Sequence, residues 1–150
     1  MPRHALRHGA LAIVLAATAA LTTACSGEPD AYQEDYGKHE PLKVTGYPTK
    51  DTLVLTQRFV WKLADRDADG LEALAAPDED VVQPDKAKTA KAWLRAYGTA
   101  AKGEVTADFA RSPAKNQDVT LTFKGKNEQL DLSLYQGPDK WSVIFHDSDN

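Results

Sequence analysis

The sequence predicts an α+β domain, with N-terminal helices packed on a curved antiparallel sheet of four or more strands. Two changes of pattern along the 150 residues support this class. Between residues 51 and 98, apolar side chains recur at helical spacing, whereas from residue 104 onward they alternate with polar ones. Helices followed by a closing run of strands are typical of α+β domains. We therefore expect a single domain over residues 51–147, preceded by a signal peptide (1–24) and a linker (25–50).

The N-terminal segment has the three parts of an export signal. Arg3 and Arg7 supply positive charge, residues 10–21 are apolar, and small residues lead to a cleavage point. The apolar run is about a dozen residues long, whereas a membrane-spanning helix needs roughly 20. The segment is therefore predicted to be removed rather than to span a bilayer.

The stretch Leu21-Thr22-Thr23-Ala24-Cys25 ends in the one cysteine of the chain. It resembles the lipobox of bacterial lipoproteins, although leucine usually stands three residues before the cysteine, where this chain has Thr22. The resemblance implies cleavage before Cys25 and a diacylglycerol on its thiol, with further acyl chains such as palmitate. It thus implies a lipid anchor on the outer face of the cytoplasmic membrane. The alternative is an ordinary secreted protein in which Cys25 is incidental.

Charge and cysteine content limit the classes of partner. Loss of residues 1–24 removes two basic residues and no acidic one, so the net charge of −4 becomes −6. An acidic chain with no basic cluster argues against nucleic acid and against electrostatic binding to anionic lipid. If Cys25 is acylated, no thiol remains for a disulfide, and the domain must depend on its hydrophobic core.

Residues 25–50 are interpreted as a flexible linker, because proline, glycine and mixed charges occur there without apolar periodicity. Such a segment spans ~25–30 Å on average. Its tyrosines leave open whether its far end packs on the domain. These tyrosines are Tyr32, Tyr36 and Tyr47.

Three helices are expected in the first half of the domain. The first begins at Thr52 with Asp51 as its cap and ends in the acidic stretch 65–70. Its buried stripe is Leu53, Thr56, Phe59, Val60 and Leu63. Trp61 is on a second side, where packing under the linker is favoured over a place at a pocket mouth.

The second and third helices follow at once. A short helix with Leu71, Leu74 and Ala75 facing inward runs to Pro77, and Pro84 opens the third. The apolar face of the third helix is Ala90, Trp93, Leu94 and Tyr97, and it ends at Gly98 or Gly103.

Four runs of alternating residues predict an antiparallel meander with one buried face. The inward positions are Val105, Ala107 and Phe109; Val119, Leu121 and Phe123; Leu130, Leu132 and Leu134; and Trp141, Val143 and Phe145. Because Trp141 is assigned to the core, its replacement by alanine is expected to cost ~3–5 kcal/mol.

The stretch from Phe59 to Asp78 resembles the opening of nuclear transport factor 2-like domains, and the resemblance covers roughly residues 51–147. It implies a cone whose curved sheet wraps around the helices and often encloses a pocket. Members of that superfamily include isomerases, cyclases, dehydratases and many non-catalytic binding modules, so fold does not decide function. The residues expected to line such a pocket are Phe59, Leu63, Trp93, Tyr97, Phe109, Phe123, Trp141 and Phe145. None except Tyr97 is an acid or base, which counts against catalysis.

The pattern Asp65-x-Asp67-x-Asp69-Gly70 matches the first half of an EF-hand loop. Its twelfth position is Ala76 instead of the required carboxylate, so an acidic turn between helices is favoured, with weak calcium binding left open. The histidines after the signal, His39 and His146, are far apart in sequence and do not predict a zinc site. No cofactor or metal is expected. The outer face of the sheet, which includes Tyr135 and Ile144, is a candidate surface for a homodimer or a partner.

Together these patterns favour a lipid-anchored, non-catalytic domain that binds an apolar small ligand or a protein partner. The alternative is a small-molecule enzyme of the same fold, of the isomerase, dehydratase or hydrolase type. It would use His146, or an acid wrongly assigned to the outside, as its base.

Overall fold

The computed structural model describes residues 38–111 and 114–146, which form an α+β domain with an open five-stranded sheet. In chain order its elements are β1 (Lys43–Gly46), α2 (Lys50–Asp65), α3 (Ala68–Glu72), α4 (Lys86–Tyr97), the 3₁₀ turn η1 (Ala100–Lys102), β2 (Val105–Phe109), β3 (Asn116–Phe123), β4 (Gln129–Gln136) and β5 (Trp141–Ile144). The predicted signal peptide, Cys25 and the linker up to residue 37 lie outside the described residues. Within the described ranges, no helix is both long enough and apolar enough to cross a membrane.

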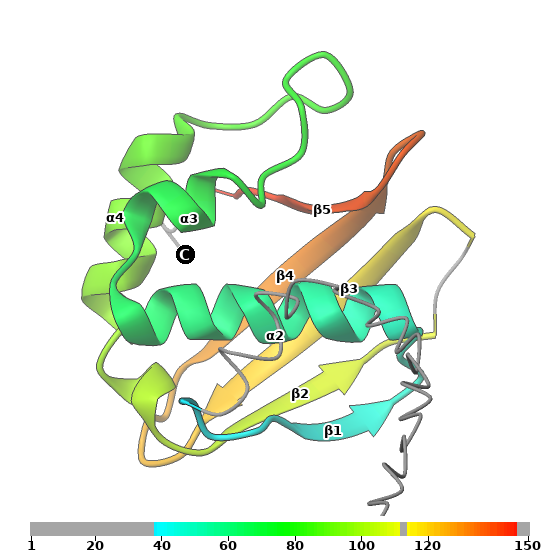
Figure 1. Ribbon diagram of the computed structural model, residues 1–150. Coiled ribbons are helices and arrows are strands. Elements are labelled where there is room, and N and C mark those ends of the chain that lie inside the picture. The colour runs from blue at the N-terminus through cyan, green and yellow to red at the C-terminus, as the bar shows by residue number, and fades with distance from the viewer. Residues whose placement is uncertain (1–37, 112–113, 147–150) are drawn as a thin grey trace, which may run out of the picture.

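The strands are ordered β1-β2-β3-β4-β5, and the four predicted strands β2 to β5 form the expected antiparallel meander. Their register pairs buried residues across neighbouring strands, as in Val119 with Leu132 and Leu134 with Val143. One face of the sheet is therefore apolar, and α2 lies across it (Figure 1).

The strand β1 was not expected, because residues 43–46 fall in the segment interpreted as a flexible linker. It pairs with β2 in parallel, Val44 opposite Ala107, and the backbone amide of Tyr47 donates to the carbonyl of Phe109. All four residues of β1 are exposed, so they show no alternation of apolar and polar side chains. The helices consequently lie between β1 and β2, and the expectation that they open the domain is wrong.

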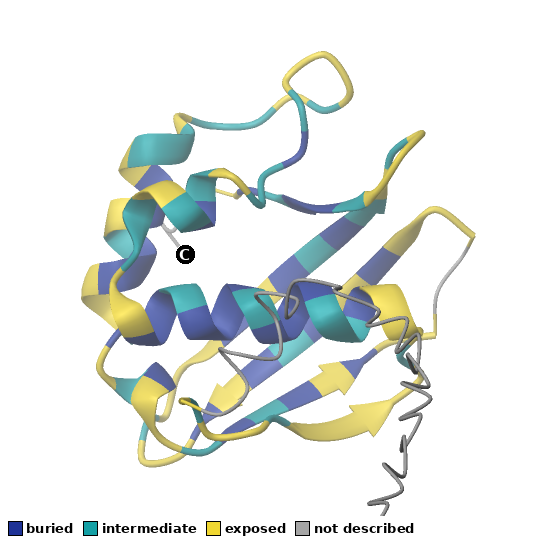
Figure 2. Ribbon diagram, in the orientation of Figure 1, coloured by how far each residue is buried: buried dark blue, intermediate teal, exposed yellow. Residues whose placement is uncertain are grey.

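The helix α2 begins at Lys50, and its cap is Thr49 rather than the expected Asp51. The side chains of Thr49 and Thr52 each accept from the other's backbone amide, which forms a capping box. Phe59 and Leu63 face the sheet and are fully buried, and Trp61, on the second side, is also buried. Buried residues thus occur on two sides of this helix (Figure 2).

The helices α3 and α4 pack beside α2 (Figure 1). In α3, Leu71 is fully buried, but the helix stops at Glu72. Leu74 and Ala76 instead pair with β5: the amide of Val143 donates to the carbonyl of Leu74, and the amide of Ala76 donates to the carbonyl of Val143, both at 2.8 Å.

The helix α4 starts two residues after Pro84, with Asp85 as its cap, and ends at Gly98. Its predicted face is confirmed at Ala90, Trp93 and Leu94, which are buried, and Tyr97 is partly buried.

Aromatic side chains fill the space between the helices and the sheet. The rings of Phe59 and Trp93 pack edge to face with centroids 5.4 Å apart, and Phe145 lies 4.7 Å from Trp93. Tyr97 stacks on Phe123 at 5.1 Å. Such contacts leave the centre of the domain closely packed.

Candidate functional site

The eight residues expected to line an interior pocket divide into two groups. Six of them are at most 2% exposed and belong to the packed core: Phe59, Leu63, Trp93, Phe109, Phe123 and Phe145. Tyr97 is partly buried, and its hydroxyl donates to the carbonyl of Gln129. Trp141, also partly buried, lines an open groove at the edge of the sheet. The structure therefore brings the six core residues together, and Trp141 packs against this core while also lining the groove.

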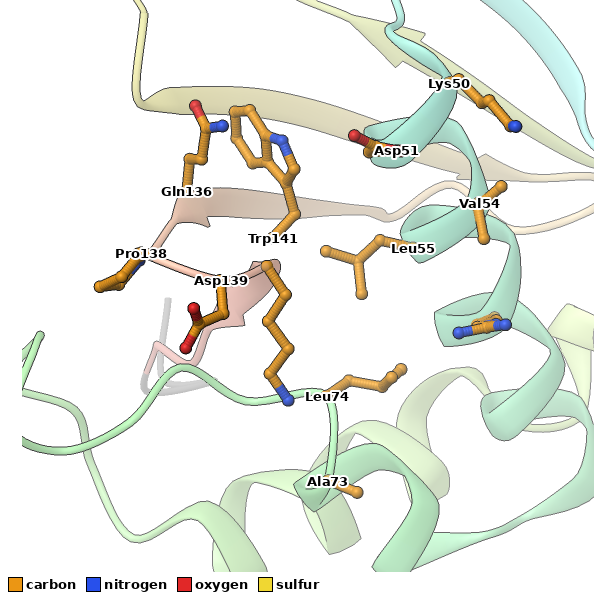
Figure 3. Close-up of a pocket in the computed structure, with 13 residues that line it drawn as sticks. Lys50, Asp51, Val54, Leu55, Ala73, Leu74, Gln136, Pro138, Asp139 and Trp141 are labelled. Carbon is orange, nitrogen blue, oxygen red and sulfur yellow. The ribbon is translucent and has the colours of Figure 1, made fainter.

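This groove, called here the β5 groove, has a volume of about 810 Å³. It lies between the first half of α2, the segment after α3 and the β4–β5 hairpin (Figure 3). Its lining residues are Lys50, Asp51, Val54, Leu55, Arg58, Ala73, Leu74, Gln136, Gly137, Pro138, Asp139, Lys140 and Trp141.

The apolar part of the β5 groove comes from three elements. Leu55 of α2, Leu74 and Trp141 of β5 converge on the space between them (Figure 3). The expectation that Trp141 is a core residue holds only in part: it packs against the core but stays partly exposed, as the first residue of a strand at the end of the sheet. The indole of Trp141 is thus partly exposed on the apolar floor of the groove.

The edge of β5 is covered along most of its length. Val143 exchanges backbone hydrogen bonds with Leu74 and Ala76, and the amide of Phe145 donates to the side chain of Gln83 at 2.9 Å. Since alternate residues of a strand present their backbone to the same edge, the peptide groups of Trp141 also face outward. The groove therefore begins where the cover of β5 ends.

Charged side chains surround the apolar floor. Lys50 and Arg58 of α2 and Lys140 of the hairpin supply three positive charges, against the carboxylates of Asp51 and Asp139. Within the described part of the chain, neither Lys50 nor Lys140 forms an ion pair. The side chains that line the groove thus carry three positive and two negative formal charges, in a chain whose net charge is −4.

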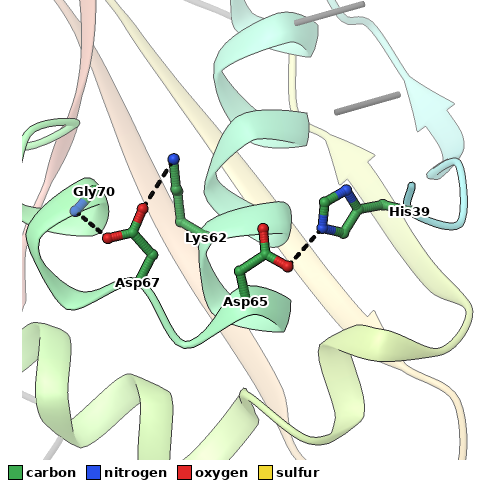
Figure 4. A network of polar contacts seen from close by, with 5 residues as sticks. All are labelled: His39, Lys62, Asp65, Asp67 and Gly70. Atoms are coloured by element: carbon green, nitrogen blue, oxygen red, sulfur yellow. Dashed lines mark hydrogen bonds and ion pairs between the residues drawn. The ribbon is translucent and has the colours of Figure 1, made fainter. Parts of the chain in front are cut away.

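A second pocket, of about 660 Å³, contains a histidine–carboxylate pair that sequence reasoning missed. His39 Nε2 lies 2.9 Å from Asp65 Oδ1 (Figure 4). The imidazole also stacks on Trp61, with ring centroids 5.3 Å apart, which confirms that Trp61 packs under the linker segment. The remaining lining is Lys38, Glu40, Ala64, Arg66, Ala101 and Lys102. The one sequence feature that pointed to this pocket was Trp61, an aromatic residue on the second side of the first helix.

The three aspartates of the calcium-like pattern are used in different ways. Asp65 pairs with His39, while Asp67 caps α3 by accepting from the amide of Gly70 at 2.8 Å (Figure 4). The hydrogen bond from Lys62, at 2.9 Å, and that from Gly70 hold the pKa of Asp67 below its usual value. Asp69 is exposed. Within residues 38–111 and 114–146, no three His, Cys, Asp or Glu side chains are grouped so that they could hold a metal ion.

The outer face of the sheet carries cross-strand hydrogen bonds. Thr45 donates to Asp108 and Thr120 donates to Asp131, each at 2.7 Å, and Ser133 donates to Asp118 at 2.9 Å. These polar groups already satisfy one another across neighbouring strands. His146 is exposed at the end of the described chain.

Known proteins were compared with this chain at the level of family models, curated sequences and solved structures, and none of them matches it.

Proposed function

We propose that this protein is a lipid-anchored, non-catalytic binding module held on the outer face of the cytoplasmic membrane through Cys25. The lipobox-like stretch and the short apolar segment before it support the anchor. Several acyl chains on one residue bind a bilayer stably, because each buried CH₂ contributes ~0.8 kcal/mol.

The β5 groove is the binding surface in this proposal, and the half-buried Trp141 is the observation that carries it. Tryptophan and arginine, surrounded by a polar rim, are the residues that dominate binding energy at protein interfaces. The groove supplies Trp141 and Arg58 beside an apolar floor.

A segment of a protein partner fits this groove better than an apolar small molecule. Pockets that bind small molecules commonly bury about 70–90% of the ligand's surface. Here the interior that would provide such enclosure is filled by Phe59, Trp93 and Phe145. The groove is open and has charges along its rim.

A relation to the nuclear transport factor 2-like cone is a further part of the proposal. The segment from Phe59 to Asp78 supports it, since it contains the end of α2 and all of α3, and α2 packs on the apolar face of the sheet. A crystal structure in which the sheet curved away from α2 would contradict the relation.

The anchor can be tested in bacterial cells fed a fatty acid with an alkyne label. The protein is expected to take up the label and to sediment with membranes, and Cys25→Ala should abolish both. Ser26→Ala is the matched control and should leave both unchanged. An unlabelled parent protein, or membrane retention of the Cys25→Ala variant, would exclude lipid anchoring at this residue.

The groove can be tested with a photo-crosslinking amino acid at Lys140, on its rim, and at Lys91, which is exposed on α4. In intact cells we expect a discrete protein adduct from position 140 and none from position 91. Trp141→Ala should remove that adduct. Equal adducts from both positions, or none from position 140, would contradict binding at the β5 groove.

The His39–Asp65 pair favours a second candidate function, proton-transfer catalysis in the His39 pocket. A carboxylate 2.9 Å from an imidazole can orient it as a general base. Among the residues that the structure describes, those lining this pocket include no serine, threonine or cysteine, so isomerisation or dehydration suits it better than acyl transfer. Turnover lost in His39→Gln and kept in Lys102→Gln would support catalysis. A panel of hydroxy acids and enolisable ketones that gave no turnover would exclude it.

A further inference from the structure

The loop between α3 and α4 carries the most exposed large apolar side chain of the described chain. Val82 is 98% exposed, compared with 60% for Tyr47 and 40% for Val44. Three carboxylates, Asp78, Glu79 and Asp80, stand just before it. We name residues 77–85 the acidic loop.

Hydrogen bonds hold the acidic loop in place. The side-chain amide of Gln83 donates to the backbone carbonyl of Ala76 at 2.8 Å, and its oxygen accepts from the backbone amide of Phe145 at 2.9 Å. Lys86 pairs with Asp78 at 2.7 Å. Because both ends of the loop are fixed, the fold keeps the side chain of Val82 in solvent.

The acidic loop and the β5 groove are neighbours. Asp80 Oδ2 lies 3.6 Å from the position that a β-carbon on Gly137 would take, and Gly137 lines the groove. Val82 does not enter the groove of its own chain, since it is almost fully exposed.

We propose that the acidic loop of a second copy of this chain occupies the β5 groove, so that Val82 contacts the partner's Leu55 and the partner's Trp141. The carboxylates of the loop would face two lysines of the groove rim, the partner's Lys50 and the partner's Lys140. This proposal rests on the proposed function, because it names the occupant of the same groove. Charge complementarity favours a second copy, since its loop offers an apolar tip beside Glu79 and Asp80, which form no ion pair within the described residues.

A reciprocal exchange of the two loops would close such a contact at two chains. A loop that lies beside the groove of its own chain can be exchanged reciprocally about a two-fold axis, and such an interface closes. Anchoring both chains in one membrane would raise their effective concentration and favour the dimer.

Disulfide trapping in the native membrane tests this arrangement. With Cys25 acylated, no other thiol competes. Two tagged chains are co-expressed, one with Val54→Cys in the groove and one with Val82→Cys in the loop, so a disulfide must join two molecules. The control pair replaces Val54→Cys by Val44→Cys on β1. We expect the 54–82 pair to cross-link clearly more than the 44–82 pair.

Charge reversal gives a second readout that does not depend on Val82 packing. Lys140→Glu in the 54-cysteine chain, or Glu79→Lys in the 82-cysteine chain, should each lower the cross-link yield. The two changes together should restore it, which a folding defect could not do.

The outcomes separate this proposal from the one on which it rests. Equal cross-linking of the 54–82 and 44–82 pairs, or no rescue by the double reversal, overturns the dimer. If the photo-crosslinker at position 140 then captures a different protein, the groove keeps its proposed function. If it captures nothing, both proposals fail.

Discussion

Two tryptophans on the inward face of the domain have different surroundings. Trp93 of α4 is 2% exposed and packs between Phe59 and Phe145. Trp141 of β5 follows the same inward pattern but remains partly exposed in the β5 groove. Periodicity therefore assigns a residue to a face, whereas its depth depends on what covers that face.

The difference also separates the core that stabilises the fold from the surface that we propose for binding. The aromatic core supplies the close packing that holds helices and sheet together. The groove is built from the ends of elements, namely the start of α2, the segment after α3 and the β4–β5 turn. Substitutions in the core should consequently lower the free energy of unfolding more than substitutions in the groove.

The largest effect is expected from Trp93→Ala, which should lower the free energy of unfolding by about 3–5 kcal/mol, because it leaves a cavity in the core. Trp141→Ala should cost only about 1 kcal/mol, since its side chain is already partly in water. Urea unfolding of both variants measures the difference. Equal losses would break the distinction between core and groove.

An intermediate loss of unfolding free energy is expected at Gln83, which attaches the acidic loop to the rest of the domain. Gln83→Ala removes hydrogen bonds to Ala76 and Phe145 and should cost about 1–3 kcal/mol. Gln136→Ala, on the groove rim, is the matched control and should stay within about 0.5 kcal/mol. Chemical denaturation would show whether the loop is fixed as described, and an unchanged midpoint for Gln83→Ala would refute it.

A smaller effect is expected at the start of α2, which forms one wall of the groove. Thr49→Ala removes the capping box and should cost about 0.5–2 kcal/mol. Asp51→Ala, at the residue that the sequence predicted as the cap, should cost less. Thermal unfolding of both variants compares them, and a larger loss for Asp51→Ala would restore the original assignment.

The smallest effect concerns pH and the turn between α2 and α3. The pKa of Asp67 is lowered in the folded state, so its contribution is present above about pH 4 and is lost as the pH falls through the lowered pKa. The side chain is 38% exposed, so we expect only a few tenths of a kcal/mol. Asp67→Asn should reduce the fall in the free energy of unfolding between about pH 5 and pH 2. About ten melting curves recorded across that pH range would measure it. Asp69→Asn is the control, and an identical pH profile for both would contradict the role of Lys62.

Much of the fold could be predicted because it depends on local pattern. The strands β2 to β5 alternate, and α2 and α4 repeat apolar residues at helical spacing, so their faces were identified correctly at Phe59, Trp93 and Leu132. Caps were less accurate: Thr49 rather than Asp51 begins α2, because two threonine side chains satisfy each other there.

The candidate site could be predicted only in part. Trp141 was among the expected lining residues, but Lys50, Arg58 and Lys140 were not, since they come from three separate positions along the chain. His39 carried no signal of its own, because its importance depends on Asp65, 26 residues away. Contacts of this kind are properties of the tertiary structure.

The sequence by itself determined the fold class, the inward faces of α2, α4 and β2 to β5, and the apolar composition of the interior. These follow from periodicity, which neighbouring residues encode. The tertiary structure alone decided that residues 43–46 become β1 through hydrogen bonds to β2, and that Trp141 lies in a groove. The physical reason is that strand pairing and depth of burial depend on which elements pack together. Local sequence patterns do not determine contacts between elements that are far apart in the chain.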